Sequence, residues 1–225
     1  MSARLDERYY QFVRQGSLAE RGLVRARTNI YNEFIRMCRP RSDETIVDVG
    51  VSDVIRGGDN MLERRYPYPD RITALGLGKA EEFQSAFPKV NYVQIEPGSR
   101  LPFDDKHFDI AVSNAVLEHV GSFEAQRSFV WELMRIGRRV FLTVPNRFFP
   151  IEPHTAIPFL HWTNATFSLA CRLLGREEWS SPRNLILMSE RSLRQICADR
   201  LGVKTGKLGL RLGPFSSNIF LLVEP

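Results

Sequence analysis

Residues 45–60, with the sequence TIVDVGVSDVIRGGDN, combine residue types that can build a site for a nucleotide-like cofactor. Asp48 and Gly50 end an apolar, β-branched run, and Ser52 and Asp53 follow in a polar turn ahead of a helix-like segment. A glycine at this point lets the backbone approach a ligand, and the start of a helix offers unpaired N–H groups. A buried strand, a glycine turn and a helix in this order predict a small-molecule cofactor site in an open α/β sheet.

A second group of residues with acid–base chemistry lies in residues 146–188, where the chain reads NRFFPIEPHTAIPFLHWTN before a short helix-like run. This segment holds Glu152, His154 and His161 among aromatic residues and prolines. Long insertions of this kind commonly form lids or substrate-binding elements. A single histidine here could equally pack in the interior or lie on the surface, so the residue types alone do not choose between a base and a structural role.

The elements that must position these residues follow from the hydrophobic pattern. Short apolar runs that read as strands alternate with helix-like segments, which predicts a parallel sheet with right-handed crossovers. Two further strand-like runs at the end of the chain are separated by a Gly-Pro turn and predict an antiparallel pair at the sheet's edge. The predicted strands are 45–49, 71–77, 89–95, 107–113, 138–144, 203–212 and 216–223.

We expect the chain to form a single domain, because its length suits one core. Helical spacing of apolar residues predicts a helical lead-in, broken at Gly16 and Gly22 and stopped by Pro40. The lead-in could cover a sheet edge or close over a ligand, and both roles stay open. The predicted parts are 1–40 (lead-in), 45–145 (cofactor-binding core), 146–188 (insertion and substrate cap) and 189–225 (terminal helix and strand pair). The terminal helix is predicted to begin at Ser189 and to run to residue 201.

Composition excludes some classes of protein. No apolar run approaches the roughly 20 residues that span a bilayer, and the first residues lack the apolar segment of a signal peptide. The three cysteines are far apart, so we expect reduced, mostly buried thiols in a cytoplasmic protein and no metal site. The net charge of +5 comes largely from arginines, which could meet an anion but are more typical of a solvated helix face.

Three segments of the chain, IVDVG, LPFDDKHFDIAVSNAVLEHV and RRVFLTVPN, together resemble the class I S-adenosylmethionine-dependent methyltransferases. The second segment is most similar to the type 11-like branch that methylates small molecules. The resemblance implies an α/β fold: a Rossmann-like, seven-stranded, mostly parallel sheet with helices on both faces and an antiparallel terminal strand. It also implies S-adenosylmethionine as cofactor, lying across the carboxyl ends of the first four strands.

The family's glycine motif, DxGxGxG, carries over only in part. Asp48 and Gly50 match its acid and first glycine, but Ser52 and Val54 stand at the second and third glycine positions. The resemblance therefore implies that Ser52 and Asp53 lie nearest the methionine part of the cofactor. Asp48 could contact the cofactor or simply hold the turn through backbone N–H groups, and both readings stay open.

Three more positions follow from the resemblance. Gly78 stands where the family usually has an acid that binds both ribose hydroxyls, and a missing acceptor costs about 1–3 kcal/mol if nothing replaces it. Glu96 lies near the position of an acid that contacts the adenine amino group. Asn114, just past the fourth strand, is expected where cofactor and acceptor meet.

Methyl transfer needs alignment and exclusion of water, and a base only if the acceptor is a hydroxyl or a protonated amine. We expect His154 to be that base, with His119 as second candidate and Glu152 as its orienting partner. Glu118 and His119 could both be plain helix-surface residues, but the resemblance places a similar pair close to the cofactor pocket, and both readings stay open.

The predicted function is methyl transfer from S-adenosylmethionine to a small or lipid- or sugar-linked acceptor. One alternative is a non-catalytic binding or regulatory protein that keeps the fold, because two glycines and the acid at Gly78 are missing. A nucleic-acid methyltransferase is the third reading; SNAV in place of an NPPY-type motif argues against it. Peripheral membrane contact, the acceptor atom and the oligomeric state stay open.

Overall fold

The computed structural model describes residues 16–55, 58–198 and 202–224 of the chain. Its centre is a seven-stranded sheet in the order β3-β2-β1-β4-β5-β7-β6. Strands β1 to β5 pair in parallel, while β7 is antiparallel to both of its neighbours, β5 and β6. The strands are β1 (Ile46–Val49), β2 (Ile72–Gly76), β3 (Asn91–Gln94), β4 (Phe108–Asn114), β5 (Gly137–Pro145), β6 (Val203–Leu212) and β7 (Phe215–Val223). This confirms the expected Rossmann-like sheet with its antiparallel terminal strand.

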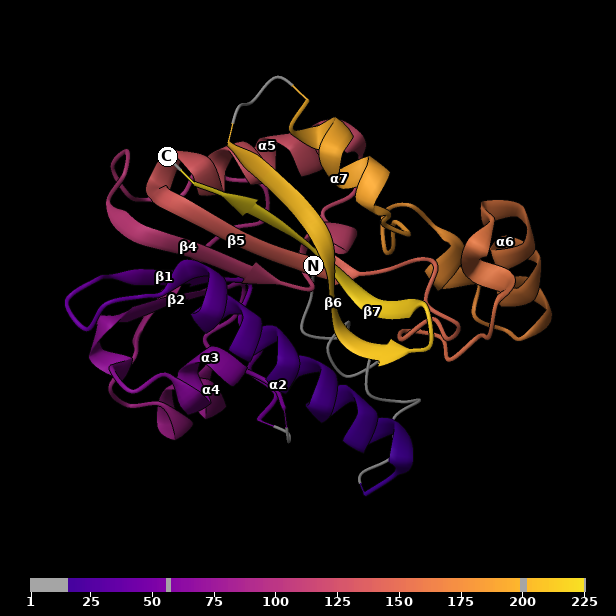
Figure 1. Ribbon diagram of the computed structural model, residues 1–225, viewed down its shortest axis with the longest axis horizontal. Coiled ribbons are helices and arrows are strands. Elements are labelled where there is room, and N and C mark those ends of the chain that lie inside the picture. Colours follow the sequence, from indigo (N-terminus) through magenta and orange to yellow (C-terminus); the bar gives the residue numbers. More distant parts are fainter. Residues whose placement is uncertain (1–15, 56–57, 199–201, 225) are drawn as a thin grey trace.

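Helices cover both faces of the sheet (Figure 1). On one face lie α2 (Leu18–Cys38), α3 (Met61–Arg65) and α4 (Glu81–Ala86), and on the other lie α5 (Phe123–Ile136) and α7 (Glu190–Ile196). Each face has its own apolar cluster, because β-strand side chains alternate between the two sides. Ile46 and Ile110 pack on the α2 side, whereas Val47 and Ala111 pack on the α5 side.

The lead-in helix differs from the prediction at Gly22. Helix α2 begins after the Ser17 cap and runs unbroken through Gly22 to Cys38. Glycine inside a helix costs only about 1 kcal/mol, and packing of residues such as Ile30 and Phe34 against the sheet outweighs that cost. The helix ends at Arg39, which adopts a left-handed conformation just before Pro40. Residues 1–15, including part of the predicted lead-in, lie outside the described residues.

The insertion between β5 and α7 forms a small apolar cluster of its own. It contains two short 3-10 turns and one helix, and Figure 1 shows that helix at the far end of the molecule from α3 and α4. These elements are η3 (Leu160–Trp162), α6 (Asn164–Leu173) and η4 (Glu177–Ser180). The buried members of the cluster are Ile157, Phe167, Ala170, Cys171, Trp179 and Leu185.

Helix α7 is shorter than expected, since it ends at Ile196 rather than near residue 201. Its start is as predicted: Ser189 caps the helix, and its hydroxyl and that of Ser192 satisfy each other's backbone N–H groups. All three cysteines are buried and free, as expected. In the ranges given above, no helix combines the length and apolar character needed to cross a membrane.

Candidate cofactor and acceptor site

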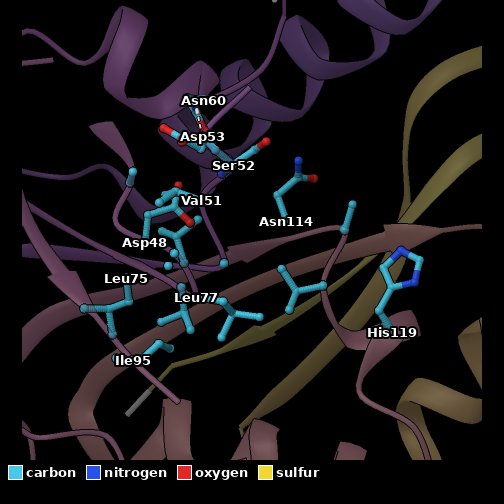
Figure 2. A pocket seen from close by; sticks show the side chains of 18 of the residues that line it. Asp48, Val51, Ser52, Asp53, Asn60, Leu75, Leu77, Ile95, Asn114 and His119 are labelled. Carbon is cyan, nitrogen blue, oxygen red and sulfur yellow. Dashed lines mark hydrogen bonds between the residues drawn. The ribbon is translucent and has the colours of Figure 1, made fainter. Parts of the chain in front are cut away.

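A cavity of about 1390 Å³ opens at the carboxyl ends of β1, β2 and β4. All seven residues predicted to bind the cofactor line it: Asp48, Gly50, Ser52, Asp53, Gly78, Glu96 and Asn114. Helix α2 forms part of the wall through Arg27, Tyr31 and Phe34, so the lead-in does lie against the ligand space. In Figure 2, Ser52 and Asp53 lie together on one side of the cavity and His119 lies apart on the other.

Gly50 is held in a conformation and a space that suit only glycine. Its φ of +100° is rarely adopted by other residues, and a Cβ built there would lie 2.2 Å from Cγ2 of Val116. The backbone is fixed in place because the N–H groups of Gly50 and Val51 both donate to the carbonyl of Leu75, at 2.8 and 3.1 Å. The first glycine of the motif thus lets the loop after β1 pass tightly beneath the loop after β4.

The loop that follows Gly50 is closed by side chains instead of the two missing glycines. The Asn60 side chain accepts from the backbone N–H of Ser52 at 3.2 Å and donates to its carbonyl at 2.9 Å. Asp53 accepts from the backbone N–H of Phe83 at 3.0 Å, which satisfies a free donor in the first turn of α4. An ion pair between Arg27 and Asp59 ties the end of the loop to α2. Only one oxygen of Asp53 has this structural role, and the residue still lines the cavity.

The end of β2 has no carboxylate at the position expected to bind the ribose. Gly78 lies there, and its carbonyl accepts from the Tyr92 hydroxyl at 2.5 Å. The nearest acids along the chain, Glu81 and Glu82, are exposed and also line the cavity. Glu96 is exposed at the rim, next to the half-buried Ile95. These acids are the residues that could replace the missing ribose ligand.

Asp48 lies beside the buried carboxyl of Glu63, a residue that the sequence analysis did not single out. Burial raises the pKa of Asp48 to about 7 and raises that of Glu63 well above its usual value, and for Glu63 the charge of Asp48 adds to the effect. Neither Glu63 oxygen has a hydrogen-bond partner in the described part of the chain. Asp48 is half-buried and lines the cavity, with the buried Glu63 behind it. An acid in this position suits a cationic ligand, and the ammonium and sulfonium groups of S-adenosylmethionine fit this description.

The Asp48 pKa leads to a prediction for cofactor binding. A cationic ligand favours ionised Asp48, so binding should release a proton, and affinity should rise as pH rises toward the pKa of about 7. Between pH 5 and pH 7 we expect the dissociation constant of S-adenosylmethionine to fall by more than about tenfold. Calorimetric titrations across this range measure it. Asp48→Asn should bind more weakly and flatten the profile, and an unchanged slope in that variant would contradict the assignment.

The predicted catalytic residues His119, His154 and Glu152 are brought together in one hydrogen-bonded chain. Nδ1 of His154 lies 2.6 Å from Oε1 of Glu152, and its Nε2 lies 3.1 Å from Nε2 of His119. Nδ1 of His119 lies 2.6 Å from the carbonyl of Asn184, which can only accept. The other Glu152 oxygen accepts from the backbone and hydroxyl of Thr155, both at 2.6 Å.

Only His119 of these three lines the large cavity; His154 and Glu152 are buried behind it. Burial, reinforced by His154, lowers the pKa of His119 to about 3, so its ring is neutral at physiological pH. For Glu152, burial opposes ionisation, but the charge and hydrogen bond of His154 keep its pKa below the ordinary value. In this geometry only His119 can meet a ligand in the cavity, and His154 and Glu152 act on it from behind through hydrogen bonds.

Two further residues complete this end of the cavity. Glu118 is buried with both carboxylate oxygens unpartnered among the described residues, and burial raises its pKa to about 7. Trp179, from η4 of the insertion, packs its ring 5.2 Å from the His154 ring and also lines the cavity. Glu118 belongs to the Glu118-His119 pair for which the sequence left a pocket role open. Trp179 had no such signal, because its position depends on the insertion folding back over β5.

Comparisons with known proteins agree with this geometry. A family model described as a methyltransferase domain matches residues 72–139, which include the segments LPFDDKHFD and SNAVLEHV. A search of curated protein sequences found no match. Among solved structures, the magnesium protoporphyrin IX methyltransferase of Synechocystis PCC 6803 with bound SAH is similar (TM-score 0.62, 14% identity, 99% of this chain and 94% of that chain covered).

Two other solved structures have similar scores. A SAM-dependent methyltransferase of Thermotoga maritima has a TM-score of 0.62 at 13% identity and covers 99% of this chain and 98% of its own. A chain from the complex of the Haloferax volcanii Trm112 methyltransferase activator with a methyltransferase has a TM-score of 0.61 at 13% identity. The match covers 100% of this chain and 99% of that chain. At such identities these structures show the fold.

The sheet order and the similar solved structures show a Rossmann-like methyltransferase fold, and a methyltransferase domain model matches residues 72–139 within it. The matched domain and the shared fold agree with the resemblance expected from the sequence, and with S-adenosylmethionine as the expected cofactor. The matched segment contains the motif that resembles the type 11-like branch.

Proposed function

We propose that this protein transfers the methyl group of S-adenosylmethionine to a small or lipid- or sugar-linked acceptor bound in the same cavity. The observation that carries the proposal is the cavity itself: at about 1390 Å³ it exceeds the roughly 300–1,000 Å³ typical of a single ligand site. The predicted cofactor residues line one side, and His119 and Trp179 line the other. There is room for the cofactor and an acceptor together.

When bound, S-adenosylmethionine supplies an electrophilic methyl group on a positively charged sulfur. The chain's task is to align the acceptor and exclude water. Asp48 and the turn from Gly50 to Asp53 hold the methionine end, while apolar residues such as Leu77 and Ile95 suit the adenine end. These assignments rest on the lining of the cavity and on the motif positions.

At the acceptor end, we propose that His119 faces the acceptor while His154 and Glu152 position it. A hydroxyl acceptor must lose its proton as the new bond to the methyl carbon forms. The pair of Nε2 atoms, 3.1 Å apart, can share one proton, and the buried Glu152 carboxylate balances its charge. An acceptor that carries no proton on its attacking atom would not need this group.

A second observation favours an acceptor with a large apolar part. The insertion exposes several large apolar side chains over a short length of chain, which is unusual for a surface that meets only water. They are Phe148, Ile151, Phe159, Leu160, Leu169, Leu173 and Leu174. Because the same insertion supplies Trp179 to the cavity, this surface could guide a lipid-linked acceptor toward the site.

Binding and transfer experiments separate the proposal from its alternatives. Calorimetry should show one equivalent of S-adenosylmethionine bound, with competition by S-adenosylhomocysteine. Incubation with tritium-labelled cofactor and a cell extract should then label an organic-soluble or small water-soluble product. Cofactor binding without any labelled product would favour the non-catalytic reading. Label in nuclease-sensitive material, or salt-dependent binding to duplex or single strands, would favour the nucleic-acid reading.

A further inference from the structure

The imidazoles of His119 and His154 meet through their Nε2 atoms, which lie 3.1 Å apart. Nδ1 of His119 donates to the Asn184 carbonyl, and Nδ1 of His154 faces the carboxylate of Glu152. If both rings are neutral, each Nε2 atom therefore carries a lone pair, and the two lone pairs face each other at 3.1 Å. Either a shared proton or a metal ion would relieve this contact.

A third ligand is already in position. The carboxylate of Glu118 is buried, and neither of its oxygens accepts a hydrogen bond from any described residue. Its Oε1 lies 3.9 Å from Nε2 of His119, and one ligand atom from each of Glu118, His119 and His154 falls within 4.8 Å of the other two. A buried carboxyl group without a hydrogen bond is rare in folded proteins, because the desolvation of its polar atoms is then not offset.

The outer contacts also match those of a metal centre. Histidines that bind a metal through one nitrogen usually donate the other N–H to a carboxylate or a backbone carbonyl, which fixes the ring and its tautomer. Here Glu152 has that position for His154, and the carbonyl of Asn184 has it for His119. Glu152 is itself held by Thr155.

From these contacts we infer that Glu118, His119 and His154 bind a first-row divalent transition cation such as Zn²⁺. Two imidazole nitrogens bound to one tetrahedral Zn²⁺ at about 2.0–2.1 Å lie roughly 3.3 Å apart, close to the observed 3.1 Å. The carboxylate needs only a small side-chain movement to join them. Two nitrogens and one oxygen suit Zn²⁺ or its neighbours better than Mg²⁺, which prefers oxygen ligands.

The buried acids beside the imidazoles could also offset the charge of an ion. Glu118 and Glu152 are both buried next to the two histidines. A divalent cation bound to two neutral imidazoles would balance both carboxylates. Arg147 also lines the small cavity beside Glu118 and Glu152, but its side chain donates to Asn164 and pairs with neither carboxylate in the described ranges.

The inferred site lies next to the acceptor end of the large cavity, because His119 and Trp179 line that cavity. Three protein ligands leave a position open, as in metal sites that bind a substrate or water. The inference therefore deepens the proposed function and rests on it for any role in acceptor binding. With the ion bound, the two Nε2 atoms no longer share a proton, and the ion's open position would instead activate a hydroxyl acceptor. The binding of the ion itself does not depend on methyl transfer.

Metal binding can be tested without an acceptor. The full chain is purified, stripped with EDTA, dialysed into metal-free buffer and titrated with Zn²⁺ in competition with a chromogenic chelator. We expect one equivalent bound at micromolar or lower dissociation constant, with Mg²⁺ failing to compete at similar concentrations. Glu118→Gln and His154→Asn should each weaken Zn²⁺ binding by at least about tenfold.

Two controls keep the outcome clear. Glu124→Gln, at an exposed residue in the first turn of α5, should bind Zn²⁺ as the unaltered protein does. Circular dichroism melts show whether each variant is folded; Glu118→Gln is the more conservative change. Absence of stoichiometric binding, or binding that both site variants retain, would overturn the inference. Loss of Zn²⁺ binding in both site variants, with S-adenosylmethionine binding intact, would support the metal site. The proposed function would still have to be tested by the methyl-transfer experiments above.

Discussion

Replacing Gly50 with alanine is expected to weaken S-adenosylmethionine binding by more than about tenfold, which corresponds to more than about 1.4 kcal/mol. The new Cβ would lie 2.2 Å from Cγ2 of Val116, and the other Val116 side-chain atoms leave little room for rotation, at 3.2 and 3.3 Å. The φ of +100° adds backbone strain for any residue with a side chain. The loop must shift, and the shift moves the cofactor-facing backbone. Calorimetry measures the loss.

The double variant Gly50→Ala with Val116→Ala separates the two causes. It removes the clash and keeps the backbone strain, so part of the affinity should return. Gly22→Ala is the matched control, because Gly22 lies within α2 and a Cβ there meets only Leu210 at 3.9 Å. That control should bind the cofactor normally. If Gly50→Ala also binds normally, the cofactor does not approach this loop as proposed.

Replacing His154 with alanine should lower turnover by about 100-fold or more while S-adenosylmethionine still binds. His154 is the central member of the chain that joins Glu152 to His119, so its removal leaves the His119 ring without its Nε2 partner. It also leaves the Glu152 carboxylate buried without its imidazole. Turnover is measured on the acceptor found with labelled cofactor, and cofactor binding is measured in parallel.

The exposed His107, at the start of β4, provides the control, since His107→Ala should keep full turnover. Glu152→Gln tests the positioning role separately. It should reduce turnover less than His154→Ala does, and it should change the pH dependence of turnover, because the amide cannot balance a proton on the imidazole pair. Unchanged turnover in His154→Ala would remove this residue from the mechanism.

The sequence predicts the sheet well because its strands are short apolar runs with clear boundaries. The predicted span of β6 is the same as the observed one, Val203–Leu212, and the other strands differ by one or two residues at their ends. The errors occur where tertiary packing overrides local preference. Gly22 does not break α2, because packing along the helix outweighs the helix propensity of one residue.

In the candidate site, too, residues set by local sequence could be predicted, and residues set by tertiary packing could not. Residues that follow strands could be placed from the motif, and all seven predicted cofactor residues line the cavity. Residues that depend on long-range packing could not be placed. Glu63 lies on α3 and reaches Asp48 only because that helix packs under β1, and Trp179 reaches His154 only through the fold of the insertion. The burial of His154 behind His119 likewise depends on contacts between distant segments.

The insertion's separate apolar cluster has a consequence for how this protein could change over time. Ile157 and Phe167 belong to a buried cluster separate from the two clusters on the sheet, so substitutions there are expected to disturb the sheet little. The insertion surface proposed to meet the acceptor can therefore diversify while the loop around Gly50 stays as it is. Related chains would be expected to exchange this segment as a unit and so acquire new acceptors on an inherited cofactor platform.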